Sequence, residues 1–290
     1  HHTGGPLPED ITDIALRMDE TCLCIQGPPG SGKTYAAATI IASLLAKGQR
    51  VGITANSHPV ILNLLEAVTQ AGSRVPFKAR VAQLHKDHDP AKLAKLGIES
   101  LSDNDDLASA LTTPGPLVVG ATAWGLCREE LAGTLDYLVV DEAGQVSLAN
   151  VVGMGLAARN LILVGDQMQL AQPTQGTHPG ESGLSSLEYL LNGRATIPED
   201  FGVFLEHSRR MHPDVCRFIS DAVYEGRLGN IPETANQAVA PAGGLADREA
   251  GIVVISVAHD GSTQSSEAEA GIIEQVVAEY NANAAALPKL

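Results

Sequence analysis

Short apolar runs alternate along the chain with stretches that carry apolar side chains at helical spacing. The apolar runs predict buried strands and occupy residues 21–26, 51–55, 117–121, 137–140 and 161–164. The helical spacing occupies residues 33–47, 60–71 and 146–158. Strands that alternate with helices predict an α/β fold with a doubly wound parallel sheet and helices on both faces. The mixed, polar stretch over residues 76–116 leaves its elements unplaced.

The pattern changes after about residue 230. Ala, Gly, Pro and Asn dominate residues 232–251, a composition typical of a connecting segment. A new apolar run at residues 252–257 predicts a strand, and residues 267–280 predict a helix. The domains predicted from this pattern are a complete α/β domain over residues 3–230, a linker over residues 231–250 and the start of a second α/β domain over residues 251–290.

A glycine-rich segment joins the first predicted strand to the first predicted helix. It carries the pattern G-x-x-x-x-G-K-T in Gly27, Pro28, Pro29, Gly30, Ser31, Gly32, Lys33 and Thr34. The glycines let successive N–H groups point at phosphate oxygens, and the helix N-terminus favours negative charge. Lys33 is then the cation for the β- and γ-phosphates, and Thr34 offers a hydroxyl ligand for magnesium. Because the complete pattern lies between a strand and a helix, a chance match in a glycine-rich turn is a poor explanation.

Two further predicted strands end in polar residues that suit nucleotide hydrolysis. Asp141 and Glu142 directly follow the apolar run at residues 137–140. In phosphate-loop enzymes an Asp at such a strand end holds magnesium, and a neighbouring Glu can deprotonate the attacking water. Gln167 follows the run at residues 161–164, where an amide can contact the γ-phosphate and the water. The alternatives are a solvated strand end for the two acids and ordinary Gly-Asp turn chemistry before Gln167.

Composition and charge narrow the class of protein. The chain has 290 residues, four cysteines and a formal net charge of −15. The few cysteines, with no signal peptide and no long apolar run, favour a cytoplasmic protein that does not contact a membrane. The negative charge counts against nucleic-acid binding, which usually needs a basic face. An acidic protein can still carry a local basic surface, so the net charge argues against nucleic-acid binding but does not exclude it.

The motifs, taken in order, resemble those of superfamily 1B helicases of the nonsense-mediated-decay and replication helicase–nuclease type, including bacterial helicase domains fused to RecB-like nucleases. The matching segments are residues 26–34 (motif I), 54–58 (motif Ia), 120–122, 141–145 (motif II), 164–170 (motif III) and 208–228 (motif IV). The motif IV segment, residues 208–228, has no counterpart in ABC transporters or small GTPases and so distinguishes the chain from both classes. The resemblance implies a RecA-like P-loop ATPase domain over residues 3–230, with ATP and Mg²⁺ as ligands. It also implies single-stranded nucleic acid as the partner, DNA rather than RNA, and allows a nuclease domain in the full-length protein.

The resemblance also implies roles for single residues. Arg210 matches an arginine that approaches the γ-phosphate, as an arginine finger. Arg209 takes the place of an aromatic residue that stacks on adenine in the family; a guanidinium can also stack, but nucleotide selectivity stays open. The residues that match contacts to the nucleic-acid backbone are Thr54, Asn56, Ser57 and Thr122. A surface salt bridge is the alternative for Arg210, and helix capping is the alternative for Asn56 and Ser57.

Parts of the family pattern are missing. The upstream glutamine motif that contacts adenine is not evident before Thr21, and Gln26 lies inside the motif I strand. Motifs V and VI, the second of which supplies another arginine, are absent. We therefore expect a truncated chain that binds nucleotide but unwinds duplexes poorly or not at all, because translocation needs two domains that close around nucleotide and strand. A strand-displacement assay checks this, and robust unwinding by the 290-residue chain would contradict it.

Two alternatives remain from the sequence. The segment of residues 85–89, His-Lys-Asp-His-Asp, resembles a metal patch, although a solvated charge run fits better because Pro90 follows directly. For the whole chain, the alternative is a P-loop switch module that hydrolyses nucleotide to control a protein partner. The acidic net charge supports that alternative, and ATP hydrolysis measured with and without single-stranded nucleic acid separates the two hypotheses.

Overall fold

The computed structural model describes residues 8–85, 90–170, 178–239, 244 and 248–286. Contacts divide the chain into two compact units, His1–His207 and Ser208–Leu290, and each unit is described by itself. The boundary between the units therefore precedes residue 230, the predicted end of the first domain. The predicted linker and second domain remain predictions.

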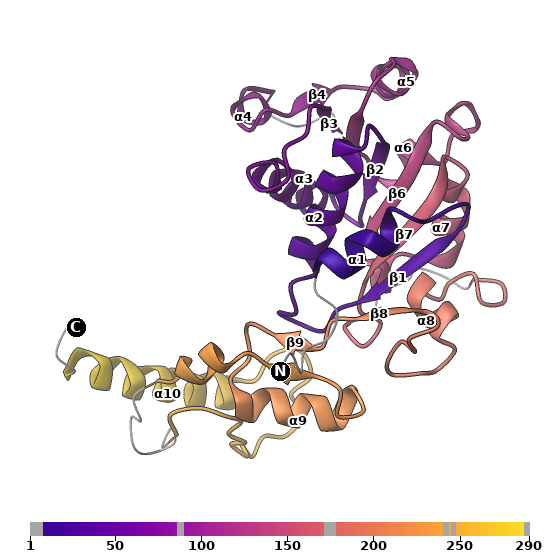
Figure 1. Ribbon diagram of the computed structural model, residues 1–290. Helices are drawn as coiled ribbons and strands as arrows, with labels where there is room; N and C mark the ends of the chain where they lie inside the picture. Colours follow the sequence, from indigo (N-terminus) through magenta and orange to yellow (C-terminus); the bar gives the residue numbers. More distant parts are fainter. Residues whose placement is uncertain (1–7, 86–89, 171–177, 240–243, 245–247, 287–290) are drawn as a thin grey trace. The chain divides into compact units, whose positions relative to one another are not determined.

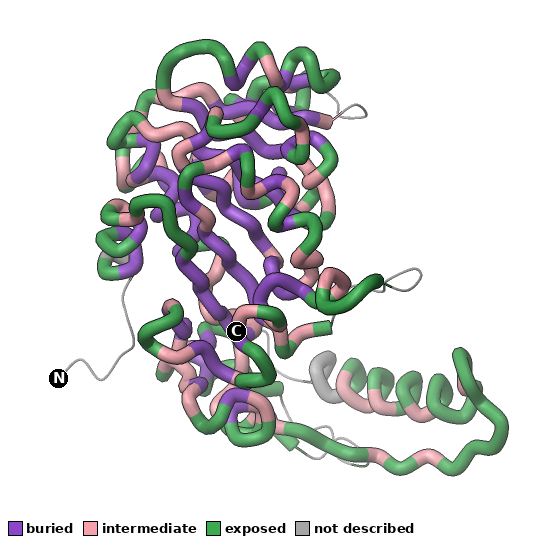
Figure 2. The backbone as a smooth tube through the Cα atoms, turned by 90° about the vertical axis from the view of Figure 1, so that its right-hand side faces the viewer, coloured by how far each residue is buried: buried purple, intermediate pink, exposed green. Residues whose placement is uncertain are grey.

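A parallel sheet forms the centre of the first unit (Figure 1). Its eight strands have the order β4-β3-β5-β2-β6-β7-β1-β8, and each neighbouring pair is parallel. The strands are β1 (Cys22–Gln26), β2 (Arg50–Thr54), β3 (Arg80–Leu84), β4 (Glu99–Leu101), β5 (Leu117–Gly120), β6 (Leu135–Asp141), β7 (Ala158–Gly165) and β8 (Gly202–Phe204). The central strands are buried along almost their whole length (Figure 2). Burial on both faces explains why they appear in the sequence as continuous apolar runs.

Helices in the connections between parallel strands cover both faces of this sheet. On one face, α2 (Lys33–Ala46) packs against α1 (Pro8–Ala15) and α3 (His58–Ala71) (Figure 1). On the other face, α7 (Leu148–Gly155) packs against α6 (Ala123–Leu126) and α8 (Ser186–Leu191). The predicted doubly wound α/β sheet is confirmed. Since all eight strands are parallel, their carboxyl ends meet at one edge, where ligands bind in such sheets.

The stretch that the sequence left unplaced contains short elements. These are β3, α4 (Pro90–Lys95), β4 and α5 (Asn104–Thr112). Two single turns follow before β7, namely η1 (Glu129–Leu131) and η2 (Ala143–Gln145). None of the described helices combines the length and the apolar character that are required to cross a membrane.

The second unit is mainly helical among its described residues. Its elements, with β9 beginning at the boundary, are β9 (His207–Ser208), α9 (Pro213–Val223), β10 (Gly229–Asn230), η3 (Pro232–Asn236) and α10 (Glu267–Ala286). The predicted helix at residues 267–280 is confirmed by α10. The predicted strand at residues 252–257 is wrong, because this segment forms no strand and Val254 is 85% exposed. A strand needs a neighbour that pairs its backbone groups, and no described strand pairs with this segment.

Candidate active site

The phosphate loop joins β1 to α2 at the carboxyl edge of the sheet. The Gly27 N–H donates to the Gly165 carbonyl at 2.9 Å, which ties the loop to the end of β7. Gly30 and Gly32 have φ angles of 75° and 90°, which side chains other than glycine rarely adopt. A Cβ atom on Gly27 would lie only 2.3 Å from Cγ of Lys33. The glycines therefore let the backbone turn closely around the Lys33 side chain.

The polar groups of this loop fit a phosphate ligand. Lys33 Nζ donates to the Gly27 carbonyl at 2.9 Å, a bond within the loop that an anion can replace. Ser31 Oγ is buried and has no hydrogen-bond partner among the described residues. Helix α2 begins after Gly32 without a side-chain cap, so its first N–H groups are available to an anion. Thr34 is exposed beside them, where its hydroxyl is accessible to a metal ion.

Asp141 ends β6 as a buried carboxylate. It accepts a hydrogen bond from the Glu142 N–H at 3.0 Å. Burial and the neighbouring charge of Glu142 raise the pKa of Asp141 to about 6, while the bond from the Glu142 N–H and the charge of Lys33 oppose the rise. A divalent cation would compensate the negative charge that burial disfavours. Asp141 and Thr34 therefore fit the predicted magnesium site.

We expect Asp141→Asn to stabilise the nucleotide-free protein at neutral pH. Because its folded pKa lies above the ordinary value of about 4, protonation favours the folded state. Asp141 thus lowers the free energy of unfolding progressively as the pH rises from about 4 through about 6. The substitution removes this penalty, which is about 3 kcal/mol at pH 7.5. Thermal unfolding at pH 7.5 and pH 4 checks the sign: the variant should melt several degrees higher only at pH 7.5. An equal gain at both pH values would contradict the assignment.

Glu142 has an unusual backbone conformation. Its φ and ψ are 51° and 42°, in the left-handed region, and its side chain is half-buried. Such a conformation costs on the order of 1 kcal/mol and persists only where the surroundings fix it. Here Glu142 is the N-cap of η2, and its carbonyl accepts a hydrogen bond from the Gln145 N–H at 2.7 Å. A glutamate that the backbone fixes beside the predicted magnesium site is consistent with the predicted general base.

The turn after Glu142 packs backbone to backbone against the end of β7. A Cβ atom on Gly144 would lie 2.3 Å from the Asp166 carbonyl oxygen, and one on Gly165 would lie 2.7 Å from the Ala143 nitrogen. Only glycine permits this approach at either position. The segment that carries Glu142 and the segment that carries Gln167 are therefore fixed to each other.

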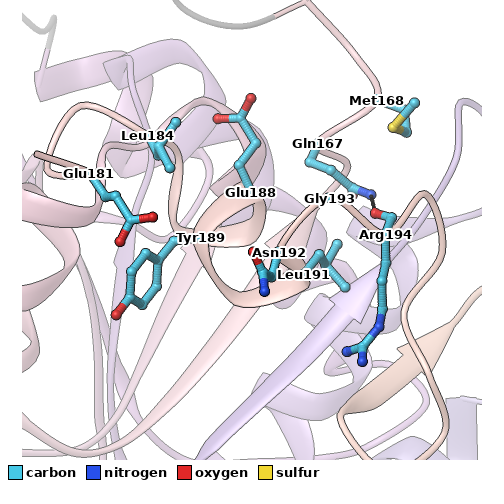
Figure 3. Close-up of a pocket in the computed structure, with 10 residues that line it drawn as sticks. All are labelled: Gln167, Met168, Glu181, Leu184, Glu188, Tyr189, Leu191, Asn192, Gly193 and Arg194. Carbon is cyan, nitrogen blue, oxygen red and sulfur yellow. Dashed lines mark hydrogen bonds between the residues drawn. The ribbon is translucent and has the colours of Figure 1, made fainter.

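Gln167 is engaged in a hydrogen-bond network that the sequence did not predict. Its Nε2 donates to the carbonyl of Arg194 at 3.3 Å (Figure 3). The same Nε2 donates to the carbonyl of Ala195 at 2.8 Å, and Oε1 of Gln167 accepts from Gln26 Nε2 at 3.0 Å. Gln26 is fully buried, and its Oε1 accepts from the Ile197 N–H at 2.7 Å. Gln26 is thus a structural amide, and a polar residue that ends an apolar strand was its only sequence signal. Gln167 must exchange these partners before it can contact a γ-phosphate, and that role stays a prediction.

The cavity beside Gln167 is not suited to phosphates. It has a volume of about 320 Å³ and is lined by the carboxylates of Glu181 and Glu188 and by Arg194 (Figure 3). The two carboxylates would repel a polyphosphate. The phosphate loop, with its lysine and helix N-terminus, therefore remains the nucleotide site.

The predicted nucleic-acid contacts lie at the ends of β2 and β5, which are neighbours in the sheet. Asn56 is exposed, and Ser57 and Thr122 are half-buried. Thr54 is only 1% exposed, because it is the last residue of a central strand. The prediction for Thr54 is therefore corrected: its side chain cannot contact a nucleic-acid strand in this structure.

Helix capping does not account for the remaining side chains in this group. Ser57 occupies the N-cap position of α3, but its side chain forms no capping hydrogen bond, and the same holds for Thr122 before α6. Asn56 Nδ2 instead donates to the backbone carbonyl of Gln145 at 3.0 Å and to its Oε1 at 3.4 Å. Asn56 therefore links the loop after β2 to the turn that carries Glu142. Nothing in the sequence places these two segments together.

Arg209 and Arg210 lie in the second unit, before α9, and both are exposed. Ser208 Oγ accepts from the N–H groups of Arg210 and Met211 at 3.3 and 3.1 Å. The Arg210 guanidinium forms no ion pair with described residues, so the salt-bridge alternative is not seen. The nucleotide contacts of both arginines stay predictions. The remaining candidate, the metal patch, falls on residues 86–89, which lie outside the described residues apart from its first histidine.

Comparisons with known proteins identify the family of this chain. A family model described as an AAA domain matches residues 11–180. The chain is similar to the DNA replication ATP-dependent helicase/nuclease dna2 of Schizosaccharomyces pombe, with 30% identity over 73% of this chain and 15% of that protein. It is also similar to DNA2 of Xenopus laevis, with 27% identity over 81% of this chain and 22% of that protein. DNA-binding protein SMUBP-2 of Mesocricetus auratus is 27% identical over 84% of this chain and 29% of that protein.

The chain thus spans less than a third of the length of each of these relatives. Among solved structures, one of Arterivirus nonstructural protein 10 (helicase) with DNA aligns with a TM-score of 0.44 and 17% identity. That alignment covers 76% of this chain and 44% of that one.

Proposed function

The chain belongs to the AAA domain family and is of the superfamily 1 helicase type, and from this premise we propose that it is the ATP-hydrolysing core of a motor that moves along single-stranded nucleic acid. The observation that carries the proposal is that the nucleotide site and the candidate nucleic-acid contacts lie at the same edge of the sheet. The phosphate loop follows β1, Asp141 ends β6 and Glu142 follows it, and the polar loops with Asn56, Ser57 and Thr122 follow the neighbouring strands β2 and β5. DNA is favoured over RNA, because the relatives are named as DNA replication and DNA-binding proteins.

The nucleotide half of the proposal assigns a task to each group at the site. Residues 27–34 hold the phosphates of ATP, and Thr34 and Asp141 hold magnesium. Bound magnesium would neutralise charge that develops on the phosphates. Glu142 accepts the proton of the attacking water. Gln167 and Arg210 are proposed to contact the γ-phosphate, with Arg209 near the base.

The nucleic-acid half of the proposal concerns Asn56, Ser57 and Thr122. Small amide and hydroxyl side chains position phosphates without selecting sequence. The hydrogen bonds from Asn56 to Gln145 supply a route by which a bound strand alters the turn that begins at Glu142. This link supports the coupling of strand binding to hydrolysis that a motor requires.

Fluorescence anisotropy with labelled oligonucleotides tests the proposal. The chain should bind single-stranded DNA more tightly than single-stranded RNA, and both more tightly than a duplex. Tighter binding of RNA would reverse the DNA preference and leave the motor in place. Absence of binding to any single strand would instead favour the P-loop switch module, which the net charge of −15 also favours.

A further inference from the structure

Trp124 is the only tryptophan of the chain and is 88% exposed. It lies in the first turn of α6, two residues after Thr122. Large aromatic side chains gain much from burial, so a side chain of this size in water is costly unless it has a partner. Its place at the carboxyl edge of the sheet, beside the proposed strand contacts, indicates what that partner is.

A cavity of about 340 Å³ lies beside Trp124. It is lined by His58, Leu84, His85, Asn104, Thr122, Trp124 and Gly125. The walls come from the ends of three strands that are neighbours in the sheet: β3 leads to His85, β5 to Thr122 and β2 to His58. The rings of His58 and His85 meet edge to face with centroids 3.8 Å apart. Its size falls within the range of about 300–1,000 Å³ that small-molecule pockets occupy.

We propose that this cavity binds one unpaired nucleobase of the single strand, stacked on the indole of Trp124. The inference rests on the proposed function and names how the strand is held. Indole rings offer a flat face to any base, and the amide of Asn104 offers a donor and an acceptor that can pair with a base edge. A base inside a duplex is covered on both faces, so the pocket also selects single strands.

The local charge explains why a base, and not a phosphate, occupies this cavity. Asp103, Asp105 and Asp106 are exposed on either side of Asn104, and carboxylates repel phosphate groups. Stacking on a neutral ring needs no basic surface, which reconciles strand binding with the acidic chain. Binding through stacking releases few counterions, so the affinity should depend only weakly on salt concentration.

Tryptophan fluorescence tests the proposal directly, because Trp124 is the sole source of the signal. The chain is titrated with labelled oligo(dT) and with an oligonucleotide of equal length whose backbone carries no bases. We expect oligo(dT) to quench the fluorescence of Trp124. The abasic strand should bind about 10-fold more weakly and should leave the fluorescence unchanged. By anisotropy, Trp124→Ala should weaken oligo(dT) binding about 10-fold, and Trp124→Phe should retain most of the affinity. Phe201→Ala is the matched control, since this exposed aromatic residue precedes β8 at the opposite edge of the sheet.

The outcomes separate this inference from the proposed function. If oligo(dT) binds but leaves the fluorescence unchanged, or if both strands quench equally, the base pocket is overturned and the motor hypothesis stands. Full affinity in the Trp124→Ala variant has the same consequence. Failure of the wild-type chain to bind any single strand overturns the proposed function and the pocket together. The comparison of the two strands on wild-type protein does not depend on the folding of a variant.

Discussion

Replacement of Glu142 by Gln is expected to lower ATP turnover about 1,000-fold in the full-length protein and to leave binding of MgATP unchanged. A positioned general base contributes roughly 10²- to 10⁴-fold to a rate, and the amide of glutamine cannot accept the proton of the attacking water. The amide nearly preserves shape, so the turn over residues 143–145 and the Asp141 bond to the backbone of residue 142 should persist. Phosphate release measures turnover, and a fluorescent ATP analogue measures binding.

Glu20→Gln is the matched control for this variant. Like Glu142, Glu20 is a glutamate with a left-handed backbone, at φ 50°. Glu20 is exposed, and it precedes β1 at the amino edge of the sheet. The control should hydrolyse ATP at the wild-type rate. Turnover that survives in the Glu142→Gln variant would remove Glu142 from the role of base.

The second large effect is expected from Lys33→Ala, which should weaken nucleotide binding about 100-fold and abolish measurable hydrolysis. Charge-assisted hydrogen bonds contribute about 1.5–3 kcal/mol each, and Lys33 is the cation around which the loop closes. Its Nζ donates to the Gly27 carbonyl at 2.9 Å, so the amine is held inside the loop that would surround a phosphate. Calorimetric titration with MgATP checks the affinity.

Lys47→Ala supplies the control, because Lys47 is exposed at the other end of α2. It removes the same charge from the same helix, far from the loop, and should bind nucleotide like the wild type. If both variants lose the same affinity, net charge and not the phosphate loop determines nucleotide binding. Unchanged binding in the Lys33→Ala variant would contradict the assignment of the site.

Much of the fold could be predicted where one local signal dominated. The strand, glycine loop and helix around Lys33 show both a hydrophobic pattern and the residues of a tight turn. In β6, a long apolar run directly precedes Asp141 and predicts that it lies at a strand end. The elements α4 and β4 are only 6 and 3 residues long, too short to show a period. Strand β3 is as long as β1, but polar Arg80 and Gln83 interrupt its apolar residues. Pairing with β5 and β3 determines the strands β3 and β4.

The missed features depend on contacts between distant segments. Residues 252–257 have the composition of a strand but no described strand to pair with. The bonds of Gln26 to Gln167 and of Asn56 to Gln145 join residues 141 and 89 positions apart, which no spacing rule connects. The residue types that carry chemistry could therefore be found in the sequence, whereas their partners required the fold.

The central claim is that ATP hydrolysis at this site responds to single-stranded nucleic acid. Steady-state hydrolysis by the full-length protein, measured without nucleic acid and with saturating single-stranded DNA, single-stranded RNA or duplex, tests it most directly, with Glu142→Gln as the background. We predict magnesium-dependent hydrolysis that rises several-fold with single-stranded DNA and little with duplex. Hydrolysis that neither single-stranded DNA nor single-stranded RNA changes would contradict the claim.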